Sequence, residues 1–163
     1  MASEAATREN YIDPALKAAY WQPSNIIREY YFTDYLIKNG VTNNLALIEI
    51  KKPSSTLLNK TAYRGSFYCA STELTGSVTQ ILDQCYQLQQ NIASIKNNNR
   101  IYDIESYAVH CILIIGTMPY GEDERKSFEV YRRNSKNVQI ITFDELLLKL
   151  KQLHGFLNDS DAN

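Results

Sequence analysis

The chain has 163 residues, enough for one domain with a sizeable buried core. Its net charge of −1 excludes the strongly basic composition of many nucleic-acid-binding proteins, so a DNA partner would depend on local basic patches or on oligomerisation. No apolar run approaches the roughly 18 residues of a membrane span, and three scattered cysteines suit reduced thiols in the cytoplasm.

The first residues of the chain, 1–10, are expected to form a disordered tail. A short helix is predicted next. Asp13 is a favourable N-cap, and Pro14 stands at the first helical position, where its missing N–H costs nothing. Pro23 ends this helix.

Two strands follow the first helix. Residues 26–37 and residues 45–52 are rich in β-branched, aromatic and aliphatic side chains, which favour strands. The turn-prone residues 39–44, with the sequence NGVTNN, lie between them. We therefore predict that the two strands form an antiparallel hairpin.

A long helix is predicted over residues 77–95, after an irregular segment that runs from Pro53 to Gly76. Ser77 and Gln80 have the spacing of a capping box at its start. Apolar residues that recur at helical spacing are expected to form its buried face. These are Ile81, Leu82, Cys85, Leu88, Ile92 and Ile95.

The second half of the chain alternates strands with helices. Hydrophobic, β-branched runs predict central strands over residues 107–116 and 138–142. A charged helix over residues 122–133 is predicted between these strands. Arginines and lysines alternate with acidic residues along it, which indicates an ordinary solvated helix.

The last helix is predicted over residues 143–157. Thr142 caps it, and Glu145, three residues further on, is the returning partner of a capping box. The helix is expected to bury a stripe of leucines: Leu146, Leu147, Leu150 and Leu153. Residues 158–163 are expected to form a second disordered tail.

The order of these elements predicts the fold class. Strands that alternate with helices in the second half imply parallel crossover connections, whereas the first two strands pair antiparallel. The class is therefore α/β, with a mixed central sheet flanked by helices. One domain is expected, over residues 11–157.

The predicted hairpin brings two carboxylates together. If residues 39–44 form its loop, Lys38 pairs with Leu45, and Asp34 lies directly opposite Glu49. A tighter turn at residues 39–40 would instead pair Asp34 with Leu45. Like charges that face each other destabilise a hairpin, so the first register requires a cation to offset the repulsion.

A hard divalent ion would supply that charge. Mg²⁺ takes one or two carboxylates and keeps several waters, so Asp34, Glu49 and the carbonyl of Ile50 are suitable ligands. Lys51 lies on the same strand face as Glu49 and could position an attacking water or stabilise charge on a phosphate. The alternative interpretation is that the strand emerges into solvent here, since an ExK tripeptide is common at strand ends.

These residues resemble the signature of the PD-(D/E)XK nuclease superfamily, with Asp34 as the first acid and Glu49, Ile50 and Lys51 as the second motif. Thr33 stands where that signature has proline, a position that varies widely in the superfamily. The resemblance implies a restriction-endonuclease-like fold.

Five longer blocks resemble the nuclease domain of Shedu antiphage-defence proteins: LIEIKKP, YRGSFYCASTELTGSVTQIL, CILIIGTM, SFEVYRRN and VQIITFDELL. Several blocks in the same order are far more specific than one tripeptide. The resemblance implies a Mg²⁺-dependent endonuclease, for which Mn²⁺ may substitute, that nicks or cuts double-stranded phage DNA. It also implies a homo-oligomer, with a tetramer as the expected form.

The resemblance adds candidates outside the hairpin. Related nucleases often place a glutamine where Gln80 stands, in contact with the metal-bound water or the phosphate; the alternative is its role in the capping box. Lys52, Lys60 and Arg64 are candidate DNA contacts, because Arg and Lys side chains near a nuclease site grip phosphates. A solvated loop is the alternative for Lys60 and Arg64.

Two other functions remain open. The same fold could bind DNA or a partner protein without cutting, which would suit the near-neutral charge. The nuclease module of a restriction enzyme's motor subunit has a similar first helix and acidic hairpin. By contrast, the sequence contains no P-loop, no GxSxG and no GxGxxG motif, so nucleotide hydrolysis and serine-hydrolase chemistry are not expected.

Overall fold

The computed structural model describes Pro14, residues 26–28 and residues 33–160. The expected tail 1–10, and Asp13 and Pro23 at the ends of the predicted first helix, lie outside the described residues. The described elements are β1 (Ile26–Arg28), β2 (Tyr35–Lys38), β3 (Asn44–Ile50), α3 (Thr72–Asn99), β4 (Glu105–Ile114), α4 (Glu122–Asn134), β5 (Val138–Ile141) and α5 (Phe143–Ser160).

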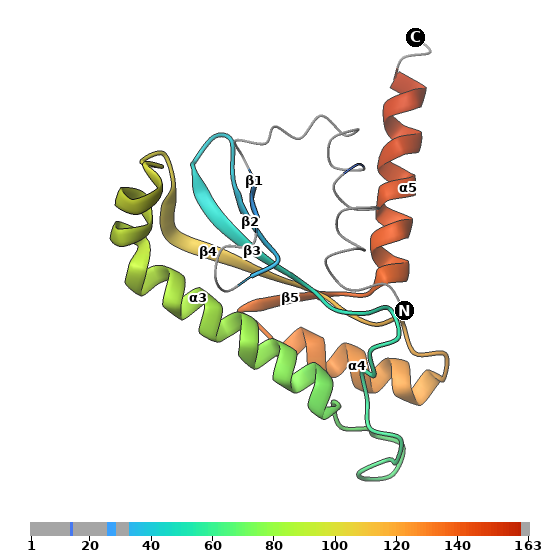
Figure 1. Cartoon of the computed structure of the whole chain (residues 1–163). Coiled ribbons are helices and arrows are strands. Elements are labelled where there is room, and N and C mark those ends of the chain that lie inside the picture. Colours follow the sequence, from blue (N-terminus) through green and yellow to red (C-terminus); the bar gives the residue numbers. More distant parts are fainter. Residues whose placement is uncertain (1–13, 15–25, 29–32, 161–163) are drawn as a thin grey trace.

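The strands form one mixed sheet in the order β1-β2-β3-β4-β5. β1, β2 and β3 pair antiparallel, whereas β3, β4 and β5 pair parallel, as the crossover helices require. α3 covers one face of the sheet and α5 lies on the opposite side (Figure 1). The predicted α/β class, with a mixed sheet flanked by helices, is confirmed.

The hairpin of β2 and β3 has the register predicted from its six-residue loop. Lys38 pairs with Leu45, and Leu36 pairs with Leu47. The tighter alternative turn is therefore wrong. Asn39 stabilises the loop, because its side-chain oxygen accepts the N–H groups of Val41 and Thr42.

The prediction of a single strand over residues 26–37 is wrong. Its two ends, β1 and β2, lie side by side and pair antiparallel, with Ile26 opposite Ile37 and Arg28 opposite Tyr35. The chain therefore reverses between Arg28 and Tyr35. Strand propensity could not show this reversal, because it reports an extended backbone and not the direction of the chain.

α3 begins at Thr72, earlier than predicted, and the capping box of Ser77 and Gln80 is wrong. Ser71 is the N-cap, and its hydroxyl accepts the N–H of Leu74 at 2.9 Å. Ser77 lies within the helix, where its hydroxyl donates to the carbonyl of Glu73 at 2.8 Å. Gln80 is therefore not needed at the helix start.

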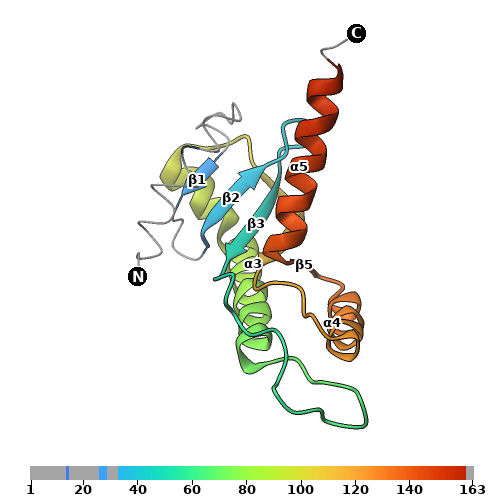
Figure 2. The ribbon, with the colours of Figure 1, turned by 90° about the vertical axis from the view of Figure 1, so that its right-hand side faces the viewer.

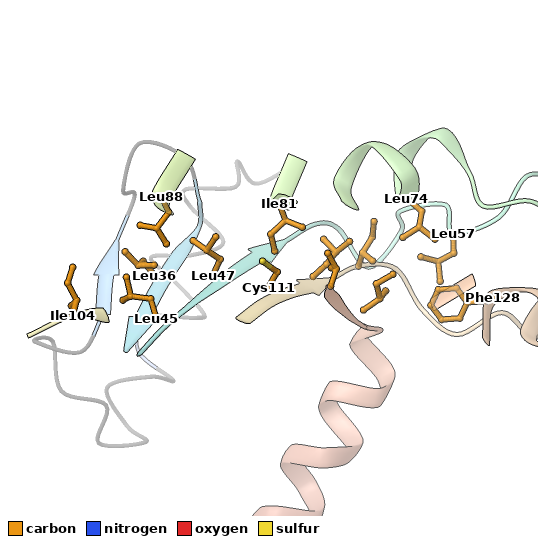
Figure 3. Close-up of a cluster of buried hydrophobic side chains, with 14 of the residues drawn as sticks. Leu36, Leu45, Leu47, Leu57, Leu74, Ile81, Leu88, Ile104, Cys111 and Phe128 are labelled. Atoms are coloured by element: carbon orange, nitrogen blue, oxygen red, sulfur yellow. The ribbon is translucent and has the colours of Figure 1, made fainter. Parts of the chain in front are cut away.

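The core lies between α3 and the sheet. The buried face of α3 consists of Leu74, Ser77, Ile81, Gln84, Leu88 and Ile95. Figure 3 shows Leu88 pointing towards Leu36, Leu45 and Leu47 of the hairpin, and Ile81 pointing towards Cys111 of β4. The alternation of β3 directs Leu45, Leu47 and Glu49 to this same face, because every second side chain of a strand points the same way.

α5 has the predicted capping box but not the predicted burial. The carboxylate of Glu145 accepts both the N–H and the hydroxyl of Thr142, at 3.1 and 2.9 Å. Leu147, Leu150 and Leu153, however, are more than half exposed, so the buried stripe is wrong for these three residues. A helical period shows which side chains share a face, and it does not show what covers that face.

No helix in the described part of the chain has both the length and the apolarity needed to cross a membrane.

Candidate active site

Glu49 is a buried carboxylate at the end of β3. It is only 4% exposed, although charged side chains are seldom buried without partners. Its position follows from strand alternation, which places it in line with Leu45 and Leu47 on the face covered by α3. A carboxylate at this place needs hydrogen-bond donors, and α3 and the end of β3 supply them.

Among the described residues, the side chains of Lys51, Gln80 and Gln84 donate to Glu49. Lys51 Nζ lies 2.6 Å from Glu49 Oε1, and Gln80 Nε2 lies 2.9 Å from the same oxygen. Gln84 Nε2 lies 3.3 Å from Glu49 Oε2. Both carboxylate oxygens are therefore engaged, and the carboxylate is held in one orientation.

Lys51 and Gln80 are also bonded to each other. Lys51 Nζ donates to Gln80 Oε1 at 3.0 Å, which closes a ring of three side chains with Glu49. The lysine side chain is 24% exposed, so the ring reaches from the buried carboxylate towards solvent. We call Glu49, Lys51 and Gln80 the site ring.

Asp34 lies across the hairpin from the site ring, one residue before β2. Its Oδ2 accepts the backbone N–H of Ile50 at 2.7 Å. Thr33 beside it donates its hydroxyl to the carbonyl of Ile48 at 3.0 Å. These bonds continue the β2–β3 pairing beyond Tyr35 and hold Asp34 next to Glu49 and Ile50.

The carbonyl of Ile50 faces the same side as Asp34. Lys51 N–H donates to Ile114 of β4, at 2.8 Å, so the neighbouring residue Ile50 presents its N–H and carbonyl towards β2. The structure thus brings together Asp34, Glu49, Ile50, Lys51 and Gln80 at the end of β3.

The candidate DNA contacts lie outside this group. Lys52 is exposed and follows Lys51 directly along the chain. Lys60 and Arg64 are exposed on residues 53–71, a segment that we call the arm. The arm connects β3 to α3 and projects past the start of α3 (Figure 2).

Gln84 is a site residue that the sequence did not identify. It is 6% exposed, and its Oε1 has no hydrogen-bond partner among the described residues. An unpaired buried amide oxygen is uncommon and indicates a place for a water or another polar ligand. The sequence feature that could have identified it is its position four residues after Gln80, on the apolar face of α3, where a polar side chain is unusual.

Glu73 is a second residue that the sequence did not identify. It stands in the first turn of α3, and its Oε2 accepts the N–H of Thr56 at 2.8 Å. The pKa of Glu73 lies below its ordinary value because of hydrogen bonds from Ser55 and Thr56 and the charges of Lys52 and Lys51. Glu73 therefore stays ionised and fixes the base of the arm beside the site.

The donors at the site suit one class of metal ion. Within the described residues, no three His, Cys, Asp or Glu side chains form a cluster that could hold a metal. Asp34, Glu49 and the Ile50 carbonyl offer oxygen atoms only, which excludes a zinc site of the usual His and Cys ligands. Mg²⁺ fits better, because it binds one or two carboxylates and takes its other ligands from water and phosphate.

Comparison with known proteins identifies relatives of this chain. A family model described as Shedu protein SduA, C-terminal, matches residues 6–147. The chain is 40% identical over 126 residues to the Shedu protein SduA of Bacillus cereus (strain B4264). The aligned region covers 74% of this chain and 33% of the relative. The chain thus spans about a third of the length of this curated relative. The resemblance to Shedu proteins is confirmed.

Proposed function

The chain belongs to the Shedu SduA C-terminal family, and on this premise we propose that it is a metal-dependent DNA endonuclease of antiphage defence. Membership of the family supports the role in defence. The site ring, with Asp34 across the hairpin, supports the chemistry, because it joins two carboxylates, an ammonium and an amide at one place. This arrangement is the observation on which the proposal rests, and its residues resemble the PD-(D/E)XK signature, with Thr33 in place of the proline.

Asp34, Glu49 and the carbonyl of Ile50 would hold Mg²⁺, with Mn²⁺ as a substitute. When bound, the ion polarises a phosphodiester oxygen and lowers the pKa of a coordinated water. Two features of the site support this assignment. All three ligand atoms are oxygens, and the buried Oε1 of Gln84 lacks a partner among the described residues.

Lys51 has the position of a group that stabilises charge. Two of its three N–H donors bind Glu49 and Gln80, which leaves the third for a phosphate oxygen or the attacking water. Gln80 holds the ammonium and the carboxylate in fixed positions, so neither needs to reorganise when charge develops on the phosphate. Since the capping role of Gln80 is wrong, this contact is the remaining explanation for it.

Lys52, Lys60 and Arg64 remain our candidates for contacts with DNA phosphates. All three are exposed and lie between Lys51 and Gln80 along the chain. We further propose that the substrate is duplex DNA and that the active form is a homo-oligomer, with a tetramer as the expected size. Mass photometry would check this size, and a monomer at the concentration of the nuclease assay would contradict it.

A supercoiled-plasmid assay tests the proposed function. The wild-type protein is expected to convert supercoiled DNA to the open circle with Mg²⁺ or Mn²⁺, and not with EDTA. Glu49→Gln and Lys51→Ala should each lower the rate at least about 100-fold, as expected for charged groups that act on the transition state.

A second ion pair supplies matched controls. Lys96 Nζ lies 3.2 Å from Glu105 Oε1, away from the site, and Lys96 has the same 24% side-chain exposure as Lys51. Glu105→Gln and Lys96→Ala should therefore leave nicking within about twofold of wild type. Nicking by Glu49→Gln at the wild-type rate would show that the proposal is wrong.

A titration of Mg²⁺ or Mn²⁺ by calorimetry separates an enzyme from a module that only binds DNA or a partner protein. A metal-binding site that disappears in Asp34→Asn supports the proposed ligands. The same heat of binding in both proteins would favour the binding module.

A further inference from the structure

The arm continues a stretch of the chain that is locally basic. Between Glu49 and Glu73 the chain contains no acidic residue, and it carries four cationic ones: Lys51, Lys52, Lys60 and Arg64. The whole chain has a net charge of −1. A locally basic stretch thus begins at the candidate active site and runs along the arm, as expected for a surface that contacts a polyanion.

The arm has the shape of a short two-stranded ribbon. Leu58 forms an isolated β-bridge with Ala70, and Arg64 forms another with Phe67. Between them, the N–H of Asn59 donates to the carbonyl of Cys69 at 2.9 Å. Two-stranded ribbons of this kind fit the major groove of B-form DNA.

The tip of the ribbon is a tight turn that exposes an aromatic ring. Gly65 has a φ of +57°, a conformation that residues with a side chain rarely adopt. The N–H of Tyr63 donates to the carbonyl of Phe67 at 2.8 Å, so the backbone of the turn is held, whereas the Tyr63 residue is 80% exposed. A ring presented in this way can contact a partner at little cost in conformational entropy.

The arm is also attached to α4. Lys126 Nζ lies 5.1 Å from the centre of the Phe67 ring, a cation–π contact. The N–H of Tyr68 donates to the hydroxyl of Ser127 at 3.0 Å. Phe67 therefore serves to anchor the arm, and Tyr63 is the aromatic ring that remains available at its tip.

Both ends of the arm lead to the candidate active site. The arm begins directly after Lys51 and Lys52, and it ends at Ser71, the N-cap of the helix that carries Gln80. Leu57 and Leu58 are buried at its base. DNA held by the arm would therefore be presented to the site ring and not to a distant surface.

We propose that the arm is a DNA-binding ribbon that enters a groove of the duplex. Lys60 and Arg64 contact phosphates on its two sides, and Tyr63 contacts the groove at the tip. This inference rests on the proposed function for its choice of partner, and it assigns DNA binding and DNA cleavage to different parts of the chain. The arm supplies affinity for duplex DNA, and the site ring performs the cleavage.

A binding assay without cleavage tests this proposal. The affinity of the full chain for a fluorescent duplex is measured by anisotropy in EDTA, across a series of salt concentrations. The slope of log K against log salt is negative, and each lost phosphate contact reduces its magnitude by about 0.9. Lys60→Ala/Arg64→Ala should therefore reduce that magnitude by about 2 and weaken binding roughly 10- to 60-fold at 0.1 M salt.

Tyr63→Ala should behave differently from the charge variants. It removes no charge, so we expect an affinity loss of about fivefold or more with an unchanged salt slope. Exposed residues away from the arm supply the controls: Lys149→Ala/Lys151→Ala on α5 for the double variant and Tyr102→Ala for the tyrosine. Circular dichroism melts of all variants should match wild type, because each replaced side chain is exposed.

The outcomes distinguish this inference from the proposed function. Glu49→Gln should bind the duplex as tightly as wild type and fail to nick it, whereas the arm variants should bind the duplex more weakly and raise the DNA concentration needed for half-maximal nicking. The ribbon proposal is overturned if wild type binds no duplex DNA, if arm and control variants bind equally well, or if the arm variants lose only single-stranded binding. Nicking by Glu49→Gln would instead refute the proposed function and leave the binding result standing.

Discussion

Gly116 follows β4 at a place where a side chain does not fit. Its φ is +61°, and a Cβ built there would lie 2.8 Å from both Leu57 Cδ2 and the carbonyl oxygen of Ser55. The N–H of Gly116 donates to the carbonyl of Lys52 at 3.1 Å, which ties the end of β4 to the base of the arm. We predict that Gly116→Ala destabilises the fold at this junction.

The size of the effect follows from two terms. An L-residue in the left-handed conformation costs roughly 1–2 kcal/mol, and forcing an extra carbon into a packed region costs about 1–3 kcal/mol. The free energy of unfolding should therefore fall by about 3 kcal/mol. For a chain of this size, about 1 kcal/mol shifts Tm by roughly 2–4 °C, so the expected fall in Tm is about 6–12 °C.

Gly76 offers the same substitution with the opposite expected sign. It lies inside α3, and a Cβ there would meet nothing within 4 Å. Gly76→Ala should stabilise the protein by about 0.5–1 kcal/mol, because alanine has the higher helix propensity. Calorimetric Tm values of the two variants and wild type check the reasoning. A Gly116→Ala protein as stable as wild type would refute the claim that this junction requires glycine.

Three further predictions concern acid stability, thiol reactivity and the supporting glutamine. The pKa of Glu145 is lowered, because hydrogen bonds from Arg132 and Thr142 outweigh the effect of burial. The ionised carboxylate therefore stabilises the fold above about pH 4.5, and this contribution is lost as pH falls through the lowered pKa. Glu145→Gln should flatten the fall in Tm between pH 5 and 3, and an unchanged fall would contradict this. Burial, together with the neighbouring thiol of Cys85, raises the pKa of Cys111 to about 12. DTNB at pH 8 should therefore label the exposed thiol of Cys69 at once and that of Cys111 only after unfolding. Rapid labelling of Cys111 in the folded protein would contradict its burial. Gln84→Leu should lower the nicking rate about tenfold, because Glu49 loses one hydrogen-bond donor. Its Tm should be unchanged or higher, because the substitution also removes a buried amide oxygen that has no partner among the described residues. Nicking at the wild-type rate would show that Gln84 does not support the site.

The hairpin register could be predicted from the sequence only as one of two alternatives. A loop of residues 39–44 places Lys38 opposite Leu45, as the structure does, whereas a turn at residues 39–40 would keep the same side chains on each face and shift the pairing by four residues. The neighbourhood of Asp34, Glu49 and Lys51 follows from that register and from the period of two in a strand. The candidate site was therefore accessible from local patterns.

The start of α3 could not be predicted in this way. Ser77 and Gln80 have the local pattern of a capping box, but Ser71 is the N-cap in the structure. Its hydroxyl also donates to the carbonyl of Thr56, in the arm. A contact between segments distant in sequence thus decides where the helix begins, and no local rule contains that contact.

The same limit explains why Gln84 was missed. A polar residue on an apolar helix face has no obvious role until its neighbour across the core is known. Here that neighbour is Glu49, from a strand that precedes α3 by the length of the arm. Only the packing of α3 on β3 reveals the pair.

The exposed surface of α5 affects how the protein behaves in solution. Six large apolar residues on this helix are more than half exposed: Leu147, Leu148, Leu150, Leu153, Phe156 and Leu157. Surfaces of this kind bind hydrophobic dyes and adsorb to plastic, and they make a protein sensitive to mild detergent. If copies associate through this face, the melting temperature will rise with protein concentration, since mass action stabilises whichever state associates. Melting curves of any two variants are therefore comparable only at one matched concentration.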